Sequence, residues 1–107
     1  MNYKTATPLE LISHIDEKYL AYKKDKQSRF CKGWTIWSTK MNTITRARGK
    51  KAGRDSNEAD LLELVFAYWQ TRSKQLELNY KKPFSKGLEK KKLGKEAIDI
   101  KKFIKEN

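Results

Sequence analysis

The sequence predicts a mainly all-α protein, in which residues 1–107 form one compact domain of three to four helices. The length suits a single hydrophobic core. Three Trp, five Tyr and four Phe are too many for a disordered chain, although 36% of the residues are charged. Apolar residues recur at helical steps of three and four in several stretches of the chain.

The first helix begins with a capping box. Thr7 and Glu10 have the required spacing, and Pro8 occupies the first helical position. One apolar stripe then continues at steps of three and four through Leu9, Ile12, Ile15, Tyr19 and Tyr22. We expect this helix to end near Lys26.

The second stretch has two interpretations. Its apolar residues keep helical spacing over fifteen residues, which favours a helix through Phe30, Trp34, Trp37, Met41 and Ile44. Gly33 and four threonines weaken that interpretation, because their helix propensity is poor. A short β element near residues 34–39 is therefore the alternative. The basic segment that follows, at about residues 46–55, contains two glycines and is expected to be a mobile loop.

The third helix is expected to be the centre of the fold. Asp55 or Ser56 caps it, and acidic side chains follow near the positive end of the helix dipole. Residues 61–69 are apolar almost all round, as in a helix that packs on several sides. Pro83 ends the helix, since the residue before a proline disfavours helical geometry.

The lysine-rich C-terminal segment, residues 81–107, shows weaker helical patterning. We expect a turn with a short helical piece over residues 84–94, and a short terminal helix from Lys95 to about Glu106. No internal repeat is recognisable in the sequence, and no linker divides the chain.

The net charge of +12 is unevenly distributed. Residues 28–54 contain eight Lys and Arg and no acid, whereas residues 81–107 contain ten Lys and four acids. Residues 55–80, between them, contain two basic and five acidic residues. Since a basic block without acids repels itself, an anionic partner such as a phosphate backbone would stabilise it. A lysine-rich surface that only aids solubility is the simpler alternative.

Enzymatic functions find little support. His14 is the only histidine and Cys31 the only cysteine, which argues against acid–base or nucleophilic catalysis and against a structural zinc site. No phosphate-cradling glycine motif is recognisable. We therefore expect no enzyme, no metal and no cofactor. The single cysteine fits a cytoplasmic or nucleoid-associated location, and no stretch approaches the roughly 20 apolar residues of a membrane helix.

The basic residues form the candidate nucleic-acid-binding site. Arginine is the informative type, because its planar guanidinium suits both phosphates and guanine edges. The predicted set comprises Arg29, Lys32, Lys40, Arg46, Arg48, Lys50, Lys51, Arg54, Lys81, Lys82, Lys90, Lys91 and Lys92. Trp34 and Trp37 are candidates for stacking on unpaired bases, although their helical spacing is more typical of core residues.

The sequence thus predicts a non-catalytic accessory protein that binds DNA or RNA through one basic face. Residues 28–54 form this face, and the C-terminal lysines extend it. A larger nucleic-acid-processing complex is the expected protein partner, and no membrane partner is expected. The alternatives are a small interaction protein of phage or mobile-element type that inhibits or redirects such a complex, and a small helical subunit of a ribonucleoprotein assembly.

Overall fold

Four helices make up the described part of the protein. The computed structural model describes residues 1–24, 30–53, 56–81 and 87–106. These residues contain no strand, and their helices are α1 (Pro8–Lys24), α2 (Phe30–Ala52), α3 (Asn57–Lys81) and α4 (Gly87–Glu106). The all-α prediction is therefore confirmed, and the β alternative near residues 34–39 is wrong.

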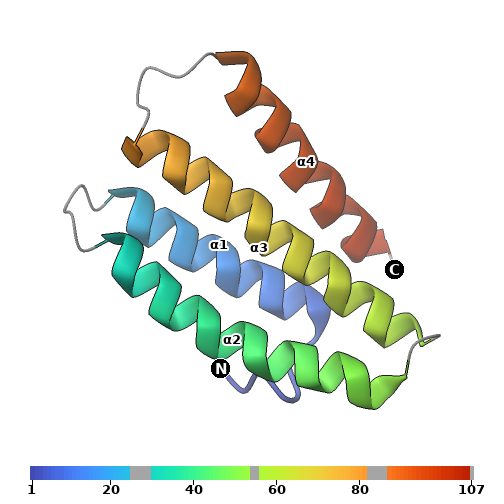
Figure 1. The fold of residues 1–107 in the computed structure, drawn as a ribbon. Coiled ribbons are helices and arrows are strands. Elements are labelled where there is room, and N and C mark those ends of the chain that lie inside the picture. Colours follow the sequence, from blue (N-terminus) through green and yellow to red (C-terminus); the bar gives the residue numbers. More distant parts are fainter. Residues whose placement is uncertain (25–29, 54–55, 82–86, 107) are drawn as a thin grey trace.

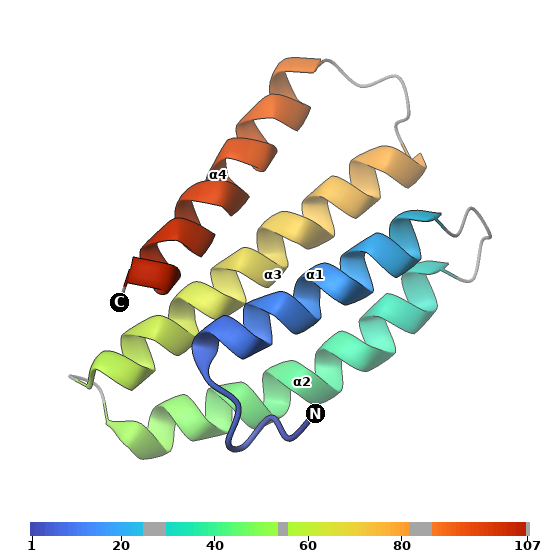
Figure 2. The same cartoon turned by 180° about the vertical axis from the view of Figure 1, so that it is seen from behind.

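Successive helices run antiparallel, and α3 lies at the centre (Figure 1). Within the described ranges, α3 packs against all three other helices, whereas α2 and α4 do not contact each other. Both views place α2 and α4 at opposite edges of a body that measures 42 × 27 × 18 Å (Figure 2). The predicted central position of the third helix is confirmed, because α3 packs against all three neighbouring helices.

Local hydrogen bonds define two helix starts. The Thr7 hydroxyl accepts a hydrogen bond from the Glu10 backbone N–H at 3.1 Å, and the Glu10 carboxylate accepts one from the Thr7 N–H at 3.3 Å. At α3, the Ser56 hydroxyl accepts a hydrogen bond from the Ala59 N–H at 3.1 Å. The capping box and the Ser56 cap are therefore confirmed. α1 ends at Lys24, close to the predicted end.

α2 is longer than predicted. It continues to Ala52, so most of the segment expected as a mobile loop at about 46–55 is helical, and that prediction is wrong. The hydroxyls of Thr39 and Thr43 donate to backbone carbonyls one turn earlier, which satisfies them within the helix. Packing against α3 offsets the weak helix propensity of this segment. Gly53 then follows the helix with φ of 98°, a conformation that favours glycine.

α4 is also longer than predicted. It runs from Gly87 to Glu106 as one helix, where the sequence predicts a turn followed by a short helix. Leu93, Ala97 and Ile104 form its buried face. The contact of this helix with α3 explains why the glycine at position 94 does not interrupt it, since tertiary packing outweighs local propensity.

Candidate nucleic-acid interface

The outward face of α2 carries the exposed cations of the acid-free block. This basic face is defined by Lys40, Arg46, Lys50 and Lys51, all of which are exposed. α2 contains no acidic residue over its whole length. No carboxylate of the described chain forms an ion pair with the three lysines. With a rise of about 1.5 Å per residue, the four cations span about 16 Å along the helix.

Small side chains separate the cations of the basic face. Thr35, Thr39, Thr43 and Ala47 are exposed on the same side of α2. Ile36 is the large apolar side chain among them, and it is 64% exposed. Because these side chains are short, they leave the longer side chains of the basic face accessible to a polyanion.

Arg46 lies over the ring of Phe66 from α3. Its Cζ atom is 4.7 Å from the ring centroid. The ring holds the guanidinium through a cation–π interaction while the side chain stays exposed. Arg46 is therefore both positioned and accessible, which suits recognition of a phosphate or a base.

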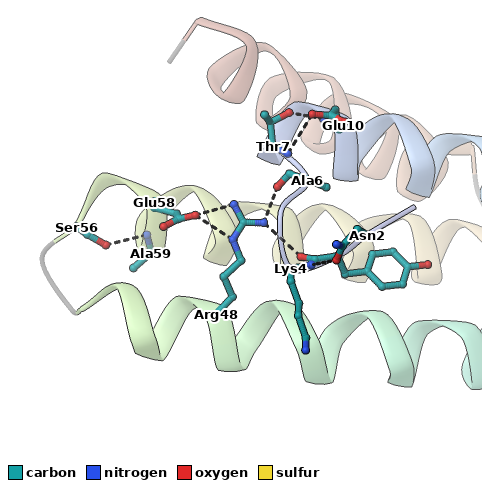
Figure 3. Close-up of polar contacts among 10 residues, drawn as sticks. Asn2, Lys4, Ala6, Thr7, Glu10, Arg48, Ser56, Glu58 and Ala59 are labelled. Atoms are coloured by element: carbon teal, nitrogen blue, oxygen red, sulfur yellow. Dashed lines mark hydrogen bonds and ion pairs between the residues drawn. The ribbon is translucent and has the colours of Figure 1, made fainter.

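Arg48 is engaged in a structural role (Figure 3). Its guanidinium donates to the Glu58 carboxylate at 2.6 and 2.9 Å, and to the backbone carbonyls of Tyr3 and Ala6. The side chain is only 17% exposed. Arg48 holds the segment before α1 against α2 and α3. Its donors are therefore not free for a phosphate, and we exclude Arg48 from the candidate interface.

The two candidate stacking residues pack inside the protein. Trp34 is 6% exposed, and its indole N–H donates to the Ser73 hydroxyl at 3.0 Å. Trp37 is half-buried and donates to the Tyr3 hydroxyl at 2.8 Å. The two indole rings also pack on each other, with centroids 5.1 Å apart. Base stacking on Trp34 is therefore wrong, because its ring is enclosed, and Trp37 offers little free surface.

The C-terminal lysines do not extend the basic face. Lys91 and Lys92 are exposed and Lys90 is half-buried, but all three belong to α4 at the opposite edge from α2. Four acids also alternate with the lysines of α4. The predicted single face is therefore wrong, since α3 separates two basic surfaces, and α2 contains no acid whereas α4 contains four.

Five members of the predicted set are not placed. Arg29, Arg54 and Lys82 lie outside the described residues. The side chains of Lys32 and Lys81 also lie outside them, although both residues belong to helices, α2 and α3 respectively.

A groove beside the basic face is the feature that sequence reasoning missed. It has a volume of about 690 Å³ and lies between the second half of α2 and the first half of α3. Asp60 and Glu63 line it from α3, opposite Arg46 and Lys50. In the sequence, these acids indicate only the start of a helix, since the pairing of α2 with α3 depends on tertiary packing.

His14 is part of a half-buried aromatic cluster. The Tyr3 hydroxyl lies 3.1 Å from His14 Nε2, and the imidazole packs edge-on against Trp37 with centroids 5.5 Å apart. Burial lowers the pKa of His14, Lys18 lowers it further, and Glu17 opposes the shift. Among the described residues, no group of three or more His, Cys, Asp or Glu side chains gathers to hold a metal ion.

No helix within the described ranges is both long and apolar enough to cross a membrane. Comparisons with protein-family models, with curated proteins and with solved structures find no match to this chain.

Proposed function

We propose that this protein is a non-catalytic accessory protein of the cytoplasm that binds nucleic acid through the basic face of α2. The observation that carries the proposal is a helix without acids that exposes four cations in about 16 Å. Phosphates neutralise such a row, and the counterions they release supply much of the binding free energy. The contacts are to the backbone and are independent of sequence.

The second basic surface, on α4, supports this function at longer range. Residues 87–106 contain seven Lys and four acids, so α4 retains a net charge of +3. Its positive field steers a polyanion toward the protein and is screened by salt within about 10 Å at 0.1 M. We assign the long-range attraction of the polyanion to α4 and the direct contact with it to α2.

The scattered distribution of the exposed apolar side chains favours a nucleic-acid partner over an apolar protein surface. Among the described side chains, the large ones are Met1, before α1, and five residues distributed over three helices: Leu9, Leu20, Ile36, Ile98 and Phe103. Single exposed apolar residues are ordinary, whereas docking of an apolar partner requires a contiguous patch. The interaction protein of phage or mobile-element type is the alternative that weak nucleic-acid binding would favour.

Two triple variants with equal charge test the proposal. One replaces Lys40, Lys50 and Lys51 by Gln on α2. The other replaces Lys95, Lys102 and Lys105 by Gln on α4, where all three are exposed. Fluorescence anisotropy with single-stranded DNA, single-stranded RNA and duplex DNA at several salt concentrations gives the slope of log K against log salt.

The expected slope for four phosphates is about −3 to −4. The α2 triple variant is expected to reduce its magnitude by about 2–3, and the α4 variant by less than about 1. Equal effects of the two triple variants would show that net charge, and not the α2 face, controls binding. Absence of binding to every nucleic acid at physiological salt would refute the function.

A further inference from the structure

The groove between α2 and α3 has two walls of opposite charge. Arg46 and Lys50 are on the α2 wall, and Asp60 and Glu63 are on the α3 wall. Gly49, Leu62 and Phe66 are among the other residues that line the groove. Its volume of about 690 Å³ lies within the range of about 300–1,000 Å³ that is usual for small-ligand sites.

The charged groups on the two walls do not pair with each other. Among the described residues, no ion pair joins Arg46 or Lys50 to Asp60 or Glu63. All four side chains are exposed and line the same hollow. A ligand with an anionic group for one wall and hydrogen-bond donors for the other would complement both walls.

Two stacked rings of α3 lie beside the groove. The rings of Phe66 and Trp69 stack with centroids 5.5 Å apart and an interplanar angle of 29°. The Arg46 guanidinium from α2 lies over the Phe66 ring, with its Cζ atom 4.7 Å from the ring centroid. A guanidinium held over a ring in this way is a platform on which an unpaired base can stack.

We infer that this groove binds an unpaired base of a single-stranded nucleic acid. The base stacks on Arg46, its phosphate lies near Lys50, and its Watson–Crick edge faces Asp60 and Glu63. The inference rests on the proposed function and adds the ligand class. A phosphate placed against Asp60 and Glu63 is repelled, whereas a base placed there offers amino and imino donors to the carboxylates. In a duplex the same edges are already paired.

The acidic wall also predicts a preference among bases. Guanine presents an imino and an amino donor side by side, which suits a carboxylate. Thymine has one imino donor between two carbonyl acceptors, and these oppose a carboxylate. We therefore expect a single guanine within a thymine strand to raise the affinity.

Three single strands of equal length and charge, together with one duplex, test the inference. The probes are an octamer of thymidine, the same octamer with one central guanine, an octamer of abasic sugar-phosphate, and an octamer duplex. At one salt concentration, the guanine strand is expected to bind about tenfold or more tightly than the abasic strand, because stacking of a base contributes to only one of them. When the binding free energy is divided by the number of phosphates in contact, the duplex is expected to bind no more tightly than the abasic strand.

A matched pair of variants makes the test specific to the groove. Asp60→Asn with Glu63→Gln removes the acidic wall, and Asp99→Asn with Glu106→Gln makes the same charge change at exposed positions of α4. The groove variant is expected to bind the abasic strand more tightly and to lose its guanine preference. The α4 variant is expected to keep the preference. Thermal unfolding confirms that both variants are folded.

The possible results separate this inference from the proposed function. Salt-dependent binding with equal affinity for the abasic and guanine strands would overturn the base site and leave backbone binding intact. Absence of binding to all strands would overturn both. Self-association in sedimentation that the groove variant abolishes would assign the groove to a second copy of the chain and overturn the base site.

Discussion

Replacing Arg48 by Ala is expected to destabilise the protein by about 2–4 kcal/mol, because it removes a charged donor from two partly buried carbonyl groups. The side chain is 17% exposed and donates to the backbone carbonyls of Tyr3 and Ala6. Each of these bonds contributes on the order of 1–1.5 kcal/mol after allowance for partial exposure. The ion pair with Glu58 adds about 0.5–1 kcal/mol, since the Glu58 side chain is 45% exposed.

Urea unfolding followed by circular dichroism measures the loss of free energy of unfolding. In thermal unfolding, the melting temperature should fall by roughly 10–20 °C. Two variants serve as controls. Arg46→Ala removes an exposed cation–π contact and is expected to cost no more than about 1 kcal/mol. Arg48→Lys keeps the charge but loses the planar fork, so its loss of stability is expected to be intermediate. If Arg48→Ala were as stable as Arg46→Ala, the structural role of Arg48 would be refuted.

Three further predictions concern the interior. The Asp16 carboxylate forms an ion pair with Lys101 at 3.0 Å and accepts a hydrogen bond from a side chain of the central helix α3. In urea unfolding, Asp16→Asn is therefore expected to lower the free energy of unfolding by about 2–3 kcal/mol. Lys101→Gln removes the exposed partner and is expected to lower it by less than about 1 kcal/mol. The lowered pKa of His14 means that the unfolded chain binds more protons, so stability should fall as pH drops below about 6.5, and His14→Gln should flatten this dependence. In Gly33→Ala, the new Cβ would lie 2.8 Å from the Tyr22 hydroxyl. We therefore expect thermal unfolding to show a net loss of stability of about 1–2 kcal/mol, which a second substitution, Tyr22→Phe, partly restores.

Local sequence determined the helices that have explicit start signals. The bonds of Thr7 with Glu10, and of Ser56 with Ala59, form between residues three positions apart, so the pattern is visible without any tertiary structure. The apolar stripes also identified most of the core, since Ile12, Ile15 and Val65 are fully buried. The positive charge of residues 28–54 is likewise a property of sequence alone.

Tertiary packing decided the features that local patterns misrepresent. Glycines, threonines and cations at 46–52 suggest a loop, but contact with α3 keeps the segment helical. Arg46 and Arg48 look equivalent in the sequence, since they are only two positions apart. They face different surroundings, because successive residues of a helix are rotated by about 100°. Arg46 lies exposed over Phe66, whereas Arg48 bonds to carbonyls more than forty residues away.

The arrangement of charge in space was also a tertiary result. In sequence, the basic blocks at 28–54 and 81–107 are separated by a short acidic segment, and one shared face is the simplest expectation. That acidic segment forms most of α3, which occupies the centre and holds α2 and α4 at opposite edges. Composition therefore determined how much charge the protein carries and that α2 contains no acid, whereas helix packing determined that the two basic helices lie apart and that α2 borders a groove.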